Sequence, residues 1–196
     1  ETLAEFDNIK IVNEDVLKVD LHKLIREEFA GMPVAVCANL PYYITSPIIM
    51  SLLEARLPIV SLTVMVQKEA AQRLCAAPGS REVGAVSIAV QYYSQPQVLF
   101  QVSRGSFMPS PDVDSTVIRL DVRQQPPVQL KKEEDFFRVV KAAFSQRRKT
   151  LPNTLSAGLA IPKQQALDLL ERAGVASNLR AEQLSMQQFA DIANAL

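Results

Sequence analysis

Residues 34–43 read VAVCANLPYY and contain the stretch that decides the fold. Within it, Val34–Ala38 is a continuous apolar run, which is typical of a strand buried on both faces of a sheet. The run stops at the turn-forming segment Asn39–Pro41. Thr45 or Ser46 can then cap a helix, because their hydroxyl groups accept hydrogen bonds from its first N–H groups. A buried strand followed by a helix predicts an α/β sheet.

The segments on either side continue this alternation of strands and helices. Short apolar and β-branched runs predict the strands, and apolar residues at helical spacing predict the helices. The last two strands are joined by a proline-rich link over Phe107–Pro111, which is typical of a long antiparallel hairpin. The further predicted strands are Ile9–Asn13, Ile59–Val66, Gln97–Arg104 and Asp114–Val122, and the predicted helices are Leu21–Phe29, Lys68–Ala76 and Gly84–Tyr93.

A break at Gln124–Pro127 separates this region from one in which every pattern is helical. The final helix has a capping box, because Ser185 and Gln188 stand three positions apart at its start. We therefore predict two domains, an α/β domain over residues 1–125 and a small helical domain over residues 126–196.

Composition excludes several classes of protein. The 196 residues are 48% hydrophobic with a formal net charge of zero, which suits one folded domain and a small appendage. Two cysteines, Cys37 and Cys75, and one histidine, His22, give no disulfide framework and no metal cluster. We find no long apolar run and no basic export signal, so we expect a cytoplasmic protein that uses an organic cofactor or none.

The segment Asn39–Tyr42 carries the most specific chemistry. An exocyclic adenine amine is a poor nucleophile because its lone pair is delocalised into the ring, so a methylating enzyme must hold both N–H groups with acceptors. Asn39 offers a side-chain carbonyl and Pro41 a backbone carbonyl. Tyr42 offers a flat face to an unstacked base, worth about 1–3 kcal/mol. Taken in isolation, the same pattern more often just turns the chain at a strand end.

Further motifs remove that isolation. With them the chain resembles the ribosomal RNA adenine dimethyltransferases over essentially its whole length. Within that family it is most similar to the bacterial small-subunit enzymes, which make two adjacent dimethyladenosines near the 3′ end of 16S rRNA. The motifs are, in order, NLPYYITSPII at 39–49, VQKEAAQRL at 66–74, PGSREVGAVSIAVQYY at 78–93, FMPSPDVDSTVIRL at 107–120 and FSQRRKTLPNTL at 144–155.

The resemblance implies S-adenosylmethionine as methyl donor, 16S rRNA in an immature 30S subunit as partner, and no metal. It implies an incomplete Rossmann-like methyltransferase sheet with an antiparallel C-terminal hairpin, followed by a small all-helical domain that contacts RNA. It assigns the target amine to Asn39 and Pro41, and places the base between Tyr42 and Phe107. Without the resemblance, Phe107 is better interpreted as a hydrophobic plug beside a proline turn.

The resemblance also assigns residues to the methyl donor and to RNA. Asp15 would accept a hydrogen bond from the adenine of the donor, beside the backbone of Val16 and near Asn39, although Asp15 alone is typical of a turn. The cluster Arg147–Lys149 ends the helix predicted from Glu133, where cations complement the helix dipole, and in the family this segment faces RNA. Arg81 is a weaker candidate for RNA contact, and a solvated loop charge is an equal alternative.

The largest departure from the family is a missing glycine-rich donor loop. None of the six glycines forms a G-x-G pattern after a strand, and the acidic ribose ligand is also missing. Residue 1 is glutamate and residues 1–8 resemble the tail of a helix, so we expect an N-terminally truncated fragment that is inactive alone. The sheet would lose its centre, so we predict that the Ile9 strand pairs with the Val34 strand, or that the exposed edge pairs with a second copy.

Three other functions compete with 16S rRNA dimethylation. One is a 23S rRNA adenine methylase that gives antibiotic resistance, and another is a DNA adenine methylase with the same Asn-x-Pro-aromatic logic. The helical tail after Pro127 and the FMPSP motif favour the 16S enzyme. The missing donor loop motivates the third alternative, a non-catalytic RNA-binding or assembly module.

Overall fold

The computed structural model describes residues 5–196. Residues 1–4 lie outside this range, so the predicted helix tail over residues 1–8 is tested only at residues 5–8, which form no helix. No helix among the described residues is long and apolar enough to span a bilayer.

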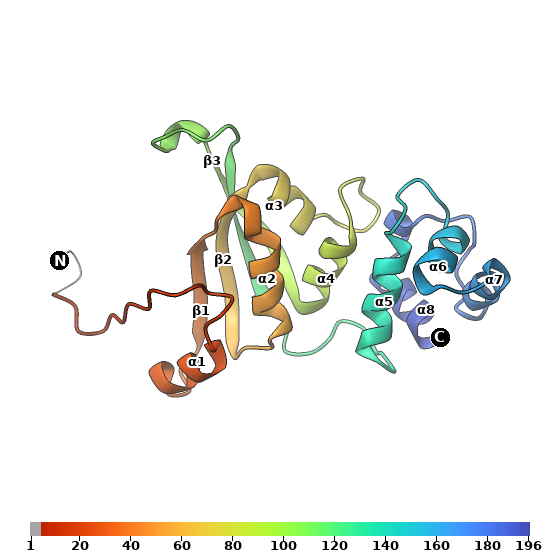
Figure 1. Ribbon diagram of the computed structural model, residues 1–196, viewed down its shortest axis with the longest axis horizontal. Coiled ribbons are helices and arrows are strands. Elements are labelled where there is room, and N and C mark those ends of the chain that lie inside the picture. Colours follow the sequence, from red (N-terminus) through yellow and green to blue (C-terminus); the bar gives the residue numbers. More distant parts are fainter. Residues whose placement is uncertain (1–4) are drawn as a thin grey trace.

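A four-stranded sheet with the order β1-β2-β4-β3 forms the first half of the molecule (Figure 1). The first pair is parallel and the other two pairs are antiparallel, which confirms the predicted mixed sheet with its C-terminal hairpin. The strands are β1 (Val34–Asn39), β2 (Ile59–Gln67), β3 (Ser94–Val102) and β4 (Ser115–Val122).

Eight α-helices and three short 3-10 helices complete the described chain. The capping box of the last one is confirmed, because the Ser185 hydroxyl accepts from the Gln188 N–H at 3.2 Å and the Gln188 amide oxygen accepts from the Ser185 N–H at 2.9 Å. The helices are α1 (Leu21–Phe29), α2 (Thr45–Glu54), α3 (Lys68–Leu74), α4 (Ala85–Tyr93), α5 (Glu133–Ala143), α6 (Leu151–Leu159), α7 (Lys163–Arg172) and α8 (Met186–Asn194).

Helices α2, α3 and α4 lie on one side of the sheet (Figure 1). Burial therefore alternates along β1, where Val34 is buried while Ala35 and Cys37 are exposed. The prediction that this strand is buried on both faces is wrong. Apolar residues on the covered face make one core with α2, α3 and α4, which includes Ile49, Leu62, Val64 and Ile118.

The predicted strand at Ile9–Asn13 is also wrong, because this segment is irregular and the Ile11 side chain is 75% exposed. An ion pair between Lys10 and Glu28 of α1 is one of its contacts. A strand forms only when a neighbour accepts its backbone hydrogen bonds, and no neighbour does so here. Its predicted pairing with β1 is therefore wrong, and β1 keeps one edge without a partner strand within residues 5–196. Pairing of that edge with a second copy stays a prediction.

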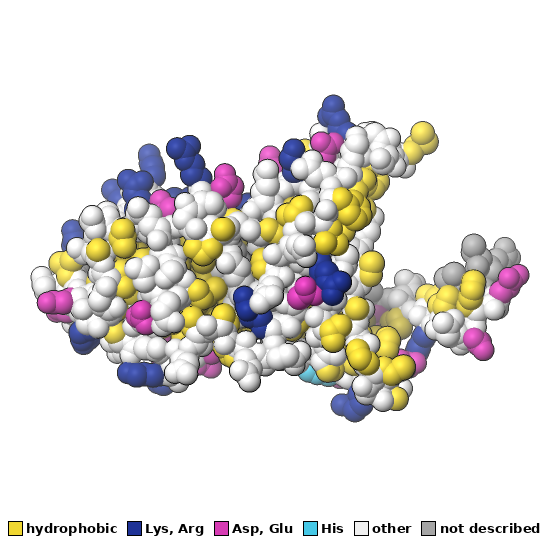
Figure 2. Space-filling view, turned by 180° about the vertical axis from the view of Figure 1, so that it is seen from behind, with side chains coloured by type: hydrophobic (Ala, Val, Ile, Leu, Met, Phe, Trp, Pro, Cys, Tyr) yellow, Lys and Arg dark blue, Asp and Glu magenta, His cyan; other side chains and the backbone are white. Residues whose placement is uncertain are grey.

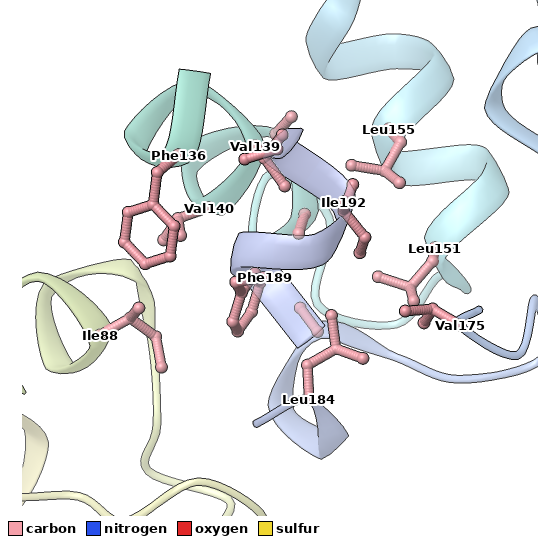
Figure 3. Close-up of a cluster of buried hydrophobic side chains, with 14 of the residues drawn as sticks. Ile88, Phe136, Val139, Val140, Leu151, Leu155, Val175, Leu184, Phe189 and Ile192 are labelled. Atoms are coloured by element: carbon pink, nitrogen blue, oxygen red, sulfur yellow. The ribbon is translucent and has the colours of Figure 1, made fainter. Parts of the chain in front are cut away.

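Helices α5 to α8 enclose a second core, to which α4 contributes Ile88 and Tyr92. Figure 3 shows Ile88 of α4 facing Phe136 and Phe189 of this core. Helices α5 and α6 approach closely at Gly158, where an added Cβ would lie 2.5 Å from the Ala142 Cα. The largest fully buried side chains of this core include Phe136, Leu151, Leu155, Leu169 and Phe189. The division into domains at residue 125 stays a prediction, since α4 contacts both cores.

Glu133, the first residue of α5, joins the two halves of the molecule. Its carboxylate accepts hydrogen bonds from the hydroxyl groups of Tyr92 at 2.9 Å and Tyr93 at 3.2 Å, and it pairs with Arg56. Burial, and then the hydrogen bond to Glu133, raise the pKa of Tyr92 to about 12. The pKa of Tyr93 is raised by burial and by the negative charge of Glu133.

Candidate functional site

The turn after β1 and the link between β3 and β4 meet at one pocket of about 410 Å³. Asn39 is the last residue of β1, and the Leu40 N–H continues the ladder by donating to the Met65 carbonyl at 3.3 Å. Phe107 reaches the pocket from the β3–β4 link. The structure thus brings together the four residues predicted to grip a base. The pocket is lined by Asn39, Leu40, Pro41, Tyr42, Phe107, Pro109 and Pro111.

The side chain of Tyr42 is anchored by a hydrogen bond to β4. Its hydroxyl oxygen lies 2.7 Å from that of Ser115, the fully buried first residue of the strand. This contact joins the turn after β1 to the start of β4, two strands away in the sheet. Sequence reasoning missed Ser115, whose signal was its place directly after the FMPSPDVD segment.

The β3–β4 link that carries Phe107 is braced by its own hydrogen bonds. The Asp114 carboxylate accepts from the Arg104 N–H at 3.0 Å, and the Ser110 hydroxyl donates to the Arg104 carbonyl at 2.9 Å. Phe107 is partly exposed and belongs to neither hydrophobic core of residues 5–196. The interpretation of Phe107 as a hydrophobic plug therefore finds no support.

The Pro41 carbonyl is already engaged within the chain. It accepts from the Ile44 N–H at 3.2 Å and from the Thr45 hydroxyl at 3.1 Å. The Thr45 hydroxyl has one proton, and the Tyr42 carbonyl also lies within its reach at 3.4 Å. The role of Pro41 as an acceptor for the target amine stays a prediction, and the amine would compete with these contacts. The neighbouring Leu40 carbonyl accepts no hydrogen bond from residues 5–196 and belongs to the same pocket wall.

The pocket is almost free of ionisable groups. Tyr42 is the single ionisable residue in its lining, which otherwise consists of an amide, a leucine, a phenylalanine and prolines. Among the described residues, no three His, Cys, Asp or Glu side chains are grouped to hold a metal. Such a pocket can hold and orient an aromatic amine, and it contains no strong general base.

Asp15 and Val16 are not brought to this pocket. The Asp15 carboxylate accepts from the Leu17 N–H at 3.0 Å, and its carbonyl accepts from the Lys18 N–H at 2.8 Å, as in an ordinary turn. Of the three residues predicted to contact the methyl donor, the pocket therefore contains Asn39 alone.

The basic cluster Arg147–Lys149 lies beyond α5, which ends at Ala143, so its predicted place in the last helical turn is wrong. The Ser145 hydroxyl donates to the Ala142 carbonyl at 2.7 Å, and this local bond competes with helix continuation. All three basic side chains, at Arg147, Arg148 and Lys149, are exposed in the turn before α6.

Arg147 and Arg81 are brought together, as the RNA-contact prediction requires. The Arg147 guanidinium donates to the carbonyls of Arg81 and Val83, each at 3.4 Å. The turn after α5 is therefore hydrogen-bonded to the link between α3 and α4, and both segments share one surface.

Comparison with known proteins gives a consistent result. The family model described as "Ribosomal RNA adenine dimethylase" matches residues 1–196. "Ribosomal RNA small subunit methyltransferase A" of Alkaliphilus oremlandii is 50% identical over 197 residues, covering 100% of this chain and 69% of that protein. The protein of the same name from Lachnoclostridium phytofermentans is 48% identical over 196 residues, covering 99% of this chain and 68% of that protein.

Solved structures share the fold. A dimethyladenosine transferase from Plasmodium falciparum superposes with a TM-score of 0.77 at 24% identity, over 95% of this chain and 72% of that one. The 23S rRNA methyltransferase ErmE superposes with a TM-score of 0.71 at 24% identity, over 100% of this chain and 75% of that one. At this identity the two likenesses establish the α/β sheet and helical tail alone.

Proposed function

Because the chain belongs to the ribosomal RNA adenine dimethylase family, we propose that it serves in the N6-dimethylation of two adjacent adenosines near the 3′ end of 16S rRNA. This reaction would take place in the cytoplasm, on an immature 30S subunit. The observation that carries the proposal is the pocket where Asn39, Tyr42 and Phe107 meet from two distant segments.

In this pocket the target adenine would leave its stack and lie between the rings of Tyr42 and Phe107. The Asn39 side-chain carbonyl would accept one N–H of the amine. We assign the second N–H to the Leu40 carbonyl, since the Pro41 carbonyl already accepts two hydrogen bonds. Catalysis would rest on holding and orienting the amine, because a methylated cationic amine loses its proton without a strong base.

S-adenosylmethionine is the methyl donor of the family and would supply the methyl group. The residues of this chain supply only part of a site for it, because Asp15 and Val16 do not line the pocket that contains Asn39 and the sequence has no glycine-rich loop after a strand. We therefore propose that these 196 residues bind the RNA and the target base but transfer no methyl group by themselves. The RNA contacts would come from the surface that carries Arg81 and Arg147–Lys149.

Binding assays with this chain test the proposal. Immature 30S particles, 23S rRNA and duplex DNA are each titrated under the same salt conditions. We expect the immature 30S particles to bind most tightly, and Asn39→Ala to weaken that binding while leaving the other two unchanged. Equal binding to all three substrates would exclude the 16S assignment, and preference for 23S rRNA would support the resistance methylase.

The donor part is tested separately by calorimetry and by transfer of a radiolabelled methyl group from S-adenosylmethionine. We expect no micromolar binding and no labelled RNA with this chain. The second candidate function, a non-catalytic RNA-binding assembly module, rests on the same misfit of the donor. Tight RNA binding that depends on Arg147 but is unaffected by Asn39→Ala would favour it.

A further inference from the structure

Three arginines from three separate segments line one cleft of about 650 Å³. Arg73 lies in the last turn of α3, Arg81 in the link between α3 and α4, and Arg147 in the turn after α5. All three are exposed. No ion pair within 4.0 Å joins any of them to a carboxylate of residues 5–196. The fixed point among them is Arg147, which donates to the Arg81 and Val83 carbonyls.

A smaller pocket of about 190 Å³ adjoins this cleft and shares Arg81, Arg147 and Phe144 with it. Ser80 also lines it. The Ser80 hydroxyl oxygen is buried and has no hydrogen-bond partner among residues 5–196. Buried polar atoms nearly always have a partner, so an orphaned hydroxyl on a residue that lines a pocket with two arginines indicates a place for a hydrogen-bonding ligand.

We propose that this cleft and the adjoining pocket bind one or two backbone phosphates of the substrate RNA, with Arg73 and Arg81 as cationic ligands in the cleft and the Ser80 hydroxyl as a further donor in the pocket. The proposal rests on the proposed function, and it adds Arg73 and Ser80 to the RNA surface. Guanidinium groups donate paired N–H groups that match phosphate oxygens, which favours a phosphate over a neutral ligand.

Acidic residues limit how much negative charge the cleft and its adjoining pocket can bind. Glu69 and Glu82 line the larger cleft, and Glu182 lines the smaller pocket. These carboxylates offset much of the positive charge, so the cleft suits one or two phosphates held by geometry rather than a polyanion held by charge alone. Such contacts position RNA and read no sequence.

The segments that form the cleft lie along the same edge of the molecule as the link that carries Phe107. The link between β3 and β4, helix α3 and the turn between α5 and α6 all lie along the upper edge of the molecule (Figure 1). Lys and Arg side chains gather along this edge over the helical half, with acidic side chains among them (Figure 2). An RNA strand that places one base beside Phe107 would cross α3, and Arg73, before it reaches Arg147.

The test measures RNA affinity as a function of salt, by fluorescence anisotropy. The probes are a hairpin RNA from the 3′ end of 16S rRNA and a hairpin of scrambled sequence. We expect Arg73→Ala to weaken binding of both RNAs about 3- to 10-fold, and to lower the slope of log affinity against log salt by about 0.7–0.9, the loss of one phosphate contact. The matched control is Arg172→Ala, an exposed arginine in the last turn of α7, which should change neither quantity.

Ser80→Ala separates a ligand role from a structural one. Removing an orphaned buried hydroxyl should leave the thermal midpoint equal or higher. The same variant should lower the affinity for both RNAs by about 2- to 5-fold. Unchanged RNA affinity in Ser80→Ala, or an unchanged salt slope in a folded Arg73→Ala, would overturn the phosphate site. If the 16S and scrambled hairpins bind equally while Arg73→Ala still lowers the slope, the proposed function fails and the phosphate site stands.

Discussion

The hydroxyl oxygens of Tyr42 and Ser115 lie 2.7 Å apart, which joins the turn after β1 to the first residue of β4. Because Ser115 is fully buried, this bond fixes the phenol end of Tyr42 and leaves the ring in the wall of the pocket. The two halves of the base pocket are therefore linked through the sheet.

The ring and the hydroxyl of Tyr42 therefore have different roles, which two substitutions can test separately. Tyr42→Ala should weaken the 16S hairpin about 5- to 100-fold, because stacking on one aromatic ring contributes about 1–3 kcal/mol. Tyr42→Phe keeps the ring and should lose less than about 5-fold. Anisotropy titration at one salt concentration measures both. Equal losses in the two variants would show that the hydroxyl, and not stacking, governs binding.

Asn39 should recognise the amine of the base. Hairpins carrying adenine or purine, which lacks the amine, at the two target positions are compared. We expect the native chain to prefer adenine about 2- to 10-fold, since a hydrogen bond contributes about 0.5–1.5 kcal/mol. Asn39→Ala should reduce this preference, and the part that remains would come from the Leu40 carbonyl, which the substitution leaves in place. A preference for adenine that is unchanged in Asn39→Ala would assign recognition to another group.

Gly158 sets the spacing of α5 and α6. Gly158→Ala places a Cβ 2.5 Å from the Ala142 Cα, so the helices must separate, and the free energy of unfolding should fall by about 1–3 kcal/mol. Gly105→Ala is the control, because its added Cβ would lie 3.7 Å from the nearest atom, the Ser103 hydroxyl. Urea unfolding compares the two. A Gly158→Ala variant as stable as the Gly105→Ala variant would contradict the close helix packing.

The tyrosines that contact Glu133 predict a loss of stability at high pH. Burial raises the pKa of Tyr92 to about 12, above the value near 10 of an unfolded tyrosine. A raised pKa means that the unfolded state loses its proton first, so this stability is fully present below pH 10 and is lost as the pH rises towards 12.

Urea unfolding between pH 8 and about 12 measures this effect. Burial also raises the pKa of Cys75 to about 11, so the titration is run on a Cys75→Ala background. Tyr92→Phe should lessen the decline between pH 10 and 12, and the rest would come from Tyr93, whose pKa is also raised. Tyr43→Phe, a change at an exposed tyrosine, should leave the decline unchanged. A decline that is the same with and without the Tyr92 hydroxyl would assign it to other groups.

The sequence predicted β2 from local signals, because a strong apolar run defines the strand. The meeting of Asn39, Tyr42 and Phe107 was implied by the resemblance to the dimethyltransferases, since the residues alone favoured a hydrophobic plug at Phe107. Ile9–Asn13 has an equally strand-like pattern, yet a strand requires a neighbour, and composition alone does not tell whether one is present.

One further error concerns the end of a helix, which a pattern places poorly. Helix α5 ends at Ala143, before the basic cluster, and the Ser145 hydroxyl bonds the Ala142 carbonyl in the turn that follows. The exposed face of β1 has a tertiary cause, since an apolar run does not say on which side the helices will lie.

The base pocket also has a consequence for the order of synthesis. Its walls come from positions 39–42 and 107–111, so the first wall emerges from the ribosome long before the second. Ser115, which anchors Tyr42, arrives later still. Under the proposed function, a nascent chain therefore has no complete pocket for an extruded nucleobase until β4 has paired with β2.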